Sequence, residues 1–276
     1  MNERYLCARI LIIASYGVMS MSLAGPFAPA AGQPSSTAIP FDSPAIAGWA
    51  DSVVSLTRGP INIANPGLGV ASFGTGANAL GPAGTDTTKV VSLGDGGAIT
   101  LQFQKPIRDD AGADLAVYEN GFADNFIELA FVEVSSNGID FFRFPAVSLT
   151  PTVAQVGAFG SLDPTDLDNL AGKYRVGFGT PFDLSTLANV SPLLDVFNVP
   201  FVRIVDVVGS VNPSFGTTDS QGRLINDPFP TAFASGGFDL DGVAALHVVP
   251  EAGTFAFSAL VMGFAAALSL RRAIRR

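Results

Sequence analysis

The stretch Ala98-Ile99-Thr100-Leu101-Gln102-Phe103-Gln104 decides the fold class. Apolar residues occupy every second position from Ile99 to Phe103, and polar residues fill the positions between them. In an extended chain this period of two places the apolar side chains on one face of a strand. The turn residues Gly94-Asp95-Gly96-Gly97 come immediately before it. The stretch therefore predicts a β-strand with one buried face.

Five further apolar runs have the length of strands and lie between turn-forming residues. They are Leu115 to Tyr118, Leu129 to Val134, Ile139 to Phe144, Phe201 to Val208 and Phe238 to Val248. The second and third are joined by Ser135-Ser136-Asn137-Gly138, in which Asn-Gly favours a hairpin turn. One short helix is expected from Asp163 to Leu170, because Asp163-Pro164 can cap and open it.

The composition also suits strands joined by turns. Of 276 residues, 48% are hydrophobic and only 14% are charged, and the chain contains 30 Gly and 19 Pro. Neither an internal repeat nor a long linker divides residues 32–248. We therefore expect an all-β fold, with a single antiparallel β-sandwich of jelly-roll type as the body.

The N-terminal residues 1–31 have the three parts of a secretory signal peptide. Arg4 and Arg9 are basic, the run from Ile10 to Ala24 is apolar, and small residues follow in Ala28-Pro29-Ala30-Ala31. Cleavage is expected either after Ala24 or near Ala31, and a buried N-terminal helix is the alternative. The single cysteine, Cys7, precedes the apolar run, so the exported chain would contain neither a lipid-bearing cysteine nor a disulfide.

The C-terminal end carries a second apolar segment. The 17 residues from Thr254 to Leu270 are uncharged, and Arg271 and Arg272 follow directly. Seventeen residues lie at the short limit for a transmembrane helix. The basic tail predicts that the C-terminus is cytoplasmic and the body is outside.

Pro250-Glu251, an apolar helix and a terminal Arg cluster, here Arg271 and Arg272, together resemble the PEP-CTERM sorting signal of Gram-negative bacteria. This chain has Ala252 where the usual motif has a second proline. The resemblance implies an exosortase-type sorting machinery as partner. It also implies a protein at the cell envelope or outer surface, anchored in the membrane at least transiently by residues 249–276. A plain C-terminal membrane anchor is the alternative.

The body has resemblances of its own. The string from Val132 to Phe141 is similar to the strand–turn–strand signature of galactose-binding-like (discoidin-type) sandwiches. Tyr118-Glu119-Asn120-Gly121-Phe122 and Gly236-Gly237-Phe238-Asp239-Leu240-Asp241 resemble segments of uncharacterised bacterial cell-surface proteins, which supply no activity. In galactose-binding-like domains a structural calcium often joins an early loop to the last strand, which implies that Asp239 or Asp241 lies near the Glu119 loop.

Oxygen-bearing side chains gather in two parts of the sequence and suggest calcium as a cofactor. Calcium binds six to eight oxygens from carboxylates, amides and carbonyls. The candidate ligands are Asp114, Glu119, Asn120, Asp124, Asp239 and Asp241. The alternative is that these residues form turns and solvated strand faces.

Enzymatic chemistry has little support. His247 is the only histidine, so a catalytic triad or a zinc site lacks its usual residues. The body holds nine basic and 22 acidic residues, a charge near −13 that repels nucleic acid. We expect a non-enzymatic binding or adhesion module for glycan or exopolysaccharide. The alternatives are a purely structural envelope or matrix protein and, with less support, a secreted hydrolase using paired carboxylates.

Overall fold

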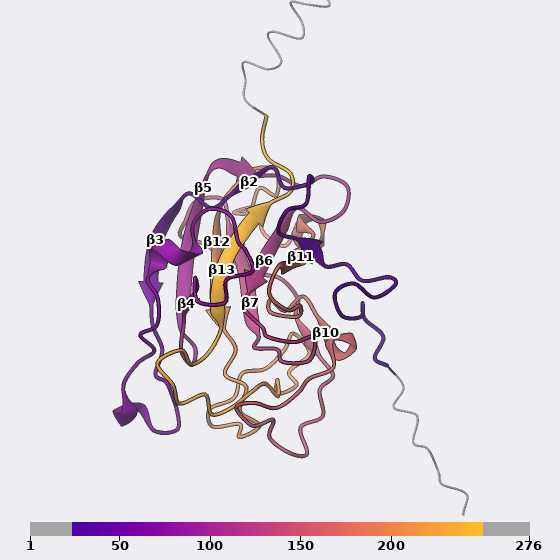
Figure 1. Cartoon of the computed structure of the whole chain (residues 1–276). Coiled ribbons are helices and arrows are strands. Elements are labelled where there is room, and N and C mark those ends of the chain that lie inside the picture. The colour runs from indigo at the N-terminus through magenta and orange to yellow at the C-terminus, as the bar shows by residue number, and fades with distance from the viewer. Residues whose placement is uncertain (1–23, 251–276) are drawn as a thin grey trace, which may run out of the picture.

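Alternating apolar residues build two antiparallel sheets in the computed structural model, which describes residues 24–250 (Figure 1). Among these residues the helical segments are four short 3₁₀ turns: η1 (Pro66–Leu68), η2 (Gly76–Ala79), η3 (Pro164–Asp166) and η4 (Leu184–Leu187). The prediction of an all-β, antiparallel sandwich is confirmed for this part of the chain.

The first sheet has the order β1-β11-β6-β13-β2, and β4 also pairs with β13. The strands are β1 (Ile39–Pro40), β11 (Phe178–Phe182), β6 (Leu115–Glu119), β13 (Asp239–Ala245), β2 (Gly48–Trp49) and β4 (Val91–Ser92). The two long central strands, β6 and β13, were both predicted from their apolar runs.

The second sheet has the order β3-β5-β12-β7-β8. Its strands are β3 (Ser52–Thr57), β5 (Ala98–Ile107), β12 (Val199–Asp206), β7 (Ala130–Ser135) and β8 (Phe142–Arg143). A separate ribbon pairs β9 (Val147–Ser148) with β10 (Leu167–Asp168). The predicted strands at 98–104, 129–134 and 201–208 are confirmed as β5, β7 and β12.

The core fills the space between the two sheets. Ile99, Leu101 and Phe103 of β5 are buried, as their alternation predicted, and they belong to one apolar cluster with residues of the facing strands β6 and β13, such as Val117 and Leu240. Burying each such side chain contributes roughly 1.5–3 kcal/mol relative to leaving it exposed. This core fixes which face of each strand points outward.

Two local predictions were wrong in extent. The helix expected from Asp163 to Leu170 is only the single turn η3: the Asp163 carboxylate accepts a hydrogen bond from Thr165 N, but Leu167 already pairs in β10. The return strand expected from Ile139 is only β8. Asn137 Oδ1 accepts hydrogen bonds from the backbone amides of Ile139 and Asp140, which keeps residues 137–140 in a loop.

The two ends of the sandwich differ. Glu119 at the end of β6 pairs with Leu240 near the start of β13, and Leu115 pairs with Ala245. We call the Glu119 side the loop end, because the long connections gather there, and the opposite side the tail end, because β13 leads from it to Pro250 (Figure 1). The five residues of β6 separate the two ends by about 13 Å.

Several predictions fall on residues that the structure does not describe. Residues 1–23 of the predicted signal peptide, the sorting residues Glu251, Arg271 and Arg272, and the predicted transmembrane helix lie outside residues 24–250, and Pro250 is the last described residue. Within the described range, no helix has the length and apolar character needed to span a membrane.

Candidate functional site

The six residues predicted as metal ligands lie in four places. Asp114 lies at the tail end, whereas Glu119, Asn120 and Asp239 meet at the loop end. Asp124 is half-buried, and its carboxylate forms an ion pair with Arg175. Asp241 lies in a groove on the outer face of the first sheet. Since β6 alone separates Asp114 from Glu119 by more than 10 Å, one ion cannot bind both.

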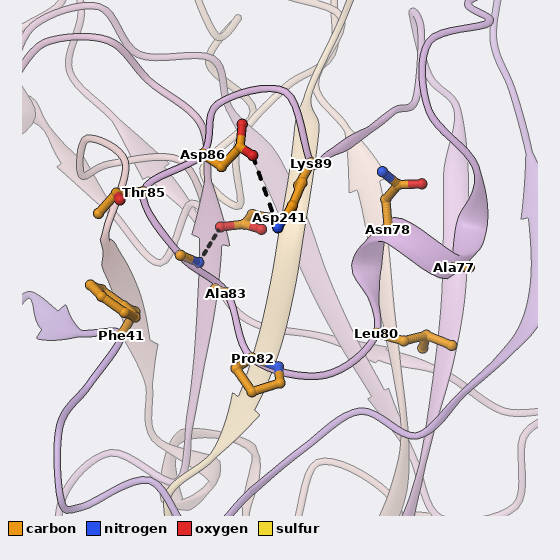
Figure 2. A pocket seen from close by; sticks show the side chains of 11 residues that line it. Phe41, Ala77, Asn78, Leu80, Pro82, Ala83, Thr85, Asp86, Lys89 and Asp241 are labelled. Carbon is orange, nitrogen blue, oxygen red and sulfur yellow. Dashed lines mark hydrogen bonds and ion pairs between the residues drawn. The ribbon is translucent and has the colours of Figure 1, made fainter.

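The groove around Asp241 has a volume of about 760 Å³ (Figure 2). The loop that includes Pro82, Thr85 and Asp86 forms much of its wall, and strand β13 supplies its floor. Phe41 contributes an aromatic ring. The other lining residues are Ala77, Asn78, Leu80, Ala83, Gly84 and Lys89.

A β-bulge in β13 gives Asp241 its position. The pairing register of β13 against β6 shifts between Leu240 and Gly242, so strict alternation is lost at Asp241. Its Oδ2 accepts a hydrogen bond of 2.9 Å from Gly84 N, which fixes the carboxylate against the 82–86 loop. Burial, together with the nearby charge of Asp86, raises the pKa of Asp241.

The groove combines balanced charge with apolar patches. Asp86 and Lys89 form an exposed ion pair at 4.0 Å, and Asn78 is held by its Oδ1, which accepts hydrogen bonds from Thr75. This leaves the Asn78 amide nitrogen and Asp241 Oδ1 without a hydrogen bond in the described chain. A neutral ligand with several hydroxyl groups fits such a surface, because it can donate to Asp241 and lay carbon–hydrogen faces on Phe41.

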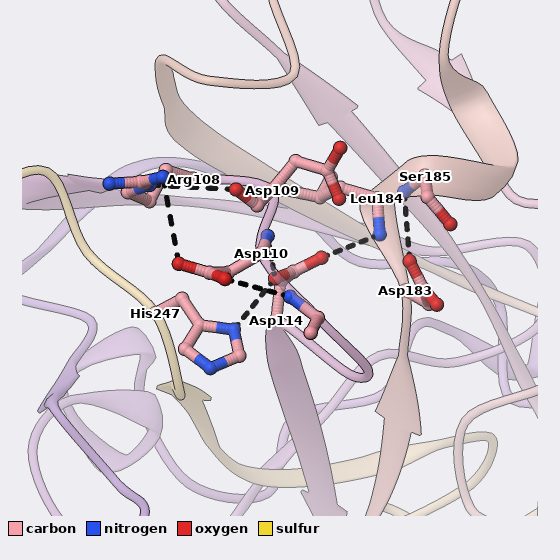
Figure 3. A network of polar contacts seen from close by, with 9 residues as sticks. Arg108, Asp109, Asp110, Asp114, Asp183, Leu184, Ser185 and His247 are labelled. Atoms are coloured by element: carbon pink, nitrogen blue, oxygen red, sulfur yellow. Dashed lines mark hydrogen bonds and ion pairs between the residues drawn. The ribbon is translucent and has the colours of Figure 1, made fainter.

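At the tail end, Asp114 is the centre of a polar network (Figure 3). Its Oδ1 lies 2.8 Å from His247 Nδ1 and accepts a hydrogen bond from Asp110 N, and its Oδ2 accepts one from Leu184 N. Burial raises the pKa of Asp114, and the hydrogen bond with His247 opposes that rise. The network joins β6, η4 and the end of β13, and it explains the single histidine without catalysis.

The same corner contains the most compact acidic group of the described residues. Carboxylate oxygens of Asp109, Asp114 and Asp183 all lie within 4.8 Å of one another, so this triad could hold a metal ion. However, both oxygens of Asp114 already accept hydrogen bonds, and Asp183 Oδ1 accepts one from Ser185 N. These contacts account for the carboxylates as structural acceptors and do not identify calcium.

The loop end holds a larger and more deeply buried acidic group. Glu119 and Asn120 follow from β6, and Asp239 begins β13. Asn120 Nδ2 donates to Asp239 Oδ2 at 3.2 Å, and Ser92 Oγ forms a short hydrogen bond with Asp239 Oδ1. Burial raises the pKa of Asp239 to about 6, and it raises that of Glu119 well above its usual value.

The predicted ligand set left out three further carboxylates at this place: Glu128, Asp206 and Asp227. Each lies next to a strand end or in a long loop, and each is less than a tenth exposed. Glu128 follows Glu119 closely in the sequence, whereas Asp206 and Asp227 lie far from Glu119, and only the strand topology brings these segments together. The sequence offered one signal in Asp206, a carboxylate that interrupts the apolar run predicted as the strand 201–208.

Comparisons with models of protein families, with curated proteins and with solved structures found no match to this chain.

Proposed function

We propose that the protein is an exported, envelope-anchored, non-enzymatic surface protein that binds glycan or exopolysaccharide in the Asp241 groove. The observation that supports this proposal is a groove of about 760 Å³ with a fixed, buried carboxylate at its floor and an aromatic ring in its wall. Such a mixture of apolar walls and a few convergent polar groups is typical of small-molecule sites.

The strand order supports a jelly-roll classification. Successive strands β4, β5, β6 and β7 belong alternately to the first and the second sheet, and β11, β12 and β13 do the same. Such alternation is what a jelly roll formed from two Greek keys requires. In this fold the outer face of a sheet is free for a ligand, and here the 82–86 loop borders it.

The geometry also suits attachment through the C-terminal segment. Val249 N donates to Pro106 O at the tail end, so the chain leaves the sandwich there. The loop end points in the opposite direction (Figure 1). An anchor in residues 249–276, handled by an exosortase-type machinery, would therefore hold the tail end toward the membrane and present the loop end outward.

The proposal predicts glycan binding that depends on Asp241. Purified full-length protein in mild detergent is applied to an array of neutral oligosaccharides built from glucose, galactose and mannose. Binding is expected, and Asp241→Ala should weaken it at least 10-fold, since the hydroxyl acceptor on the groove floor is lost. Asp140→Asn, on an exposed loop beside the second sheet, is the matched control and should bind normally.

The same experiment separates the alternatives. Absence of binding, or equal binding by Asp241→Ala, would contradict the groove proposal. Concentration-dependent self-association in sedimentation, without any glycan, would favour a structural envelope or matrix protein. Shortened oligosaccharides in the mass spectrum after incubation would instead favour a carboxylate-based hydrolase.

A further inference from the structure

The carboxylates at the loop end converge through the backbone. Glu119 pairs across the sheet with Leu240, the neighbour of Asp239. Asp227 Oδ2 accepts a hydrogen bond of 2.9 Å from Leu129 N, beside Glu128. These links bring four carboxylates from separate segments to the loop end, where the charges of Glu119, Asp227 and Asp239 act on Glu128.

Two carboxylate oxygens at this point have no partner. Glu119 Oε2 accepts a hydrogen bond from Gly121 N, but its Oε1 is buried and unpaired. Asp227 Oδ1 is likewise buried without a donor. Glu119 is only 1% exposed and Asp227 4%. A buried acceptor without a partner costs free energy, so its presence calls for a ligand that the side chains do not supply.

Glu128 lies nearest to the opening of the group. Its carboxylate is less than a tenth exposed and accepts no hydrogen bond from any described residue. It lines a small pocket of about 80 Å³ together with Asn120 and Asp239. Burial raises the pKa of Glu128 well above its usual value, and the charges of Glu119, Asp239, Asp227 and Asp206 add to that rise.

Among residues 24–250, no basic side chain forms an ion pair with this group. None of the ion pairs among the described residues includes Glu119, Glu128, Asp227 or Asp239. Arg58, whose charge acts on Asp239, donates its hydrogen bonds to the carbonyl oxygens of Phe73, Gly74 and Ser92. Buried carboxylates without a counter-charge are strongly unfavourable unless they are protonated or bind a cation.

Phenylalanine rings cover the entrance. Phe122, Phe126, Phe159 and Phe233 follow one another with ring centroids 5.5, 6.4 and 5.6 Å apart, and all four line the small pocket. Phe122 is 67% exposed and Phe159 77%. Apolar rings beside the carboxylates lower the local dielectric, and a lower dielectric strengthens the attraction of a cation.

We propose that Glu119, Glu128, Asp227 and Asp239 form a binding site for a hard divalent cation, calcium, with the Asn120 side chain at its edge. Calcium accepts several carboxylate oxygens in irregular geometry, which suits ligands from two strand ends and two loops. The four side chains are less tightly gathered than the Asp109–Asp114–Asp183 triad. Binding therefore requires them to turn toward a common centre, and Glu128 can turn without breaking a hydrogen bond.

Asp206 stands apart from the proposed ligands. Its two oxygens accept hydrogen bonds from Gly96 N and Phe238 N, at 2.8 and 2.7 Å. It adds negative charge and holds the start of β13, next to Asp239, in position. The proposed cation would thus cross-link β6 and β13 of the first sheet to the loops that contain Glu128 and Asp227.

The test is a thermal melt and a calorimetric titration of the purified full-length protein in mild detergent, with calcium chloride or with EDTA. One calcium ion per chain is expected to bind. At about 100-fold above the dissociation constant, Tm should rise by roughly 5–10 °C. Glu128→Gln is the decisive variant, because it removes no hydrogen bond of the fold; it should melt cooperatively and lose the calcium-dependent rise. Asp227→Asn should lose the rise as well.

Asp114→Asn is the matched control and should keep the calcium-dependent rise. Equal melting of the wild type in calcium and EDTA would overturn the proposal, and so would a rise that Glu128→Gln retains. A rise lost only in Asp114→Asn would move the ion to the tail-end triad and also overturn it. Glycan binding in the Asp241 groove is a separate measurement, so either proposal can fail alone.

Discussion

Lys173 is a charged residue that lies almost entirely buried in the fold. It is only 4% exposed, and its Nζ donates to Leu167 O at 2.8 Å. The rings of Phe27 and Tyr174 lie 6.0 and 5.7 Å from the ammonium. Burial lowers the pKa of Lys173 from 10.5 to about 8, although nearby aspartates oppose the change. The protein therefore buries a cation at neutral pH at a cost in stability.

Replacing this cation should stabilise the protein in a pH-dependent way. Since the folded-state pKa is the lower one, the penalty is present below pH 8 and disappears as pH rises toward 10.5. Lys173→Met should raise the free energy of unfolding by about 1–2 kcal/mol at pH 7, after about 1 kcal/mol is lost with the hydrogen bond. The gain should shrink by pH 9.5. Urea unfolding at both pH values measures it.

Lys89→Met is the control for that experiment, because the Lys89 side chain is 75% exposed. It should change stability by less than about 0.5 kcal/mol at either pH. A lower stability of Lys173→Met at both pH values would mean that the hydrogen bond and ring contacts of the ammonium outweigh its desolvation.

Some residues of the candidate sites could be predicted from the sequence, and others could not. Of the six predicted ligands, the structure brings Glu119, Asn120 and Asp239 together. It places the other three predicted ligands elsewhere. Glu128 and Asp227 were not predicted, since nothing local distinguishes a carboxylate in a turn from one folded under a sheet. Asp241 lies in a different place from Asp239 because the β-bulge after Leu240 shifts the register of β13. The alternation of apolar and polar residues in the sequence does not predict such a bulge.

At the level of elements, the predicted strands that hold are the longer apolar runs. β5 alternates strictly, β7 and β12 are richer in apolar residues, and the inward side chains of all three form part of the core. The return strand failed because side-chain hydrogen bonds from Asn137 compete with the strand ladder, which propensity does not count. The strands of two residues, such as β1 and β2, are too short to leave a periodic pattern.

The second sheet has a row of charged side chains that crosses three strands. Glu133 of β7 pairs in register with Arg203 of β12 and Arg143 of β8. Its Oε1 accepts from Arg143 Nε at 2.9 Å and its Oε2 from Arg203 Nε at 2.6 Å, while the carboxylate itself is nearly buried. The two guanidinium groups stack on Phe131 and Phe141. The row ties three strands together.

Glu133→Gln should lower the free energy of unfolding by about 1–3 kcal/mol, because charge-assisted hydrogen bonds are lost from a buried acceptor. Chemical denaturation measures the difference. Asp86→Asn, which breaks an exposed pair with Lys89, serves as control and should cost less than about 0.5 kcal/mol. If both variants lost the same small amount of free energy of unfolding, the contacts of Glu133 would contribute no more than an exposed ion pair does.

At the scale of the whole molecule, the described N-terminal segment is part of the packed body. Gly25 N donates to Thr165 Oγ1 at 2.6 Å, and Phe27 N donates to Thr165 O at 3.0 Å. Ala31 is 3% exposed, and its carbonyl accepts a hydrogen bond from Arg175. A cut after Ala31 would remove all of these contacts, whereas a cut after Ala24 would keep them.

If the chain is exported as proposed, we predict that the mature form begins at Gly25, the first of the two cleavage positions that the sequence allows. Mass spectrometry of the full-length gene product, expressed in a Gram-negative host and recovered from the envelope, measures the N-terminus. Ala24→Leu should leave the precursor uncut, since the site needs a small residue there. A mature chain that begins at Gly32 would mean that export removes the segment before it can pack. Loss of the contacts at Thr165 and Arg175 would then be expected to lower Tm relative to a chain that begins at Gly25.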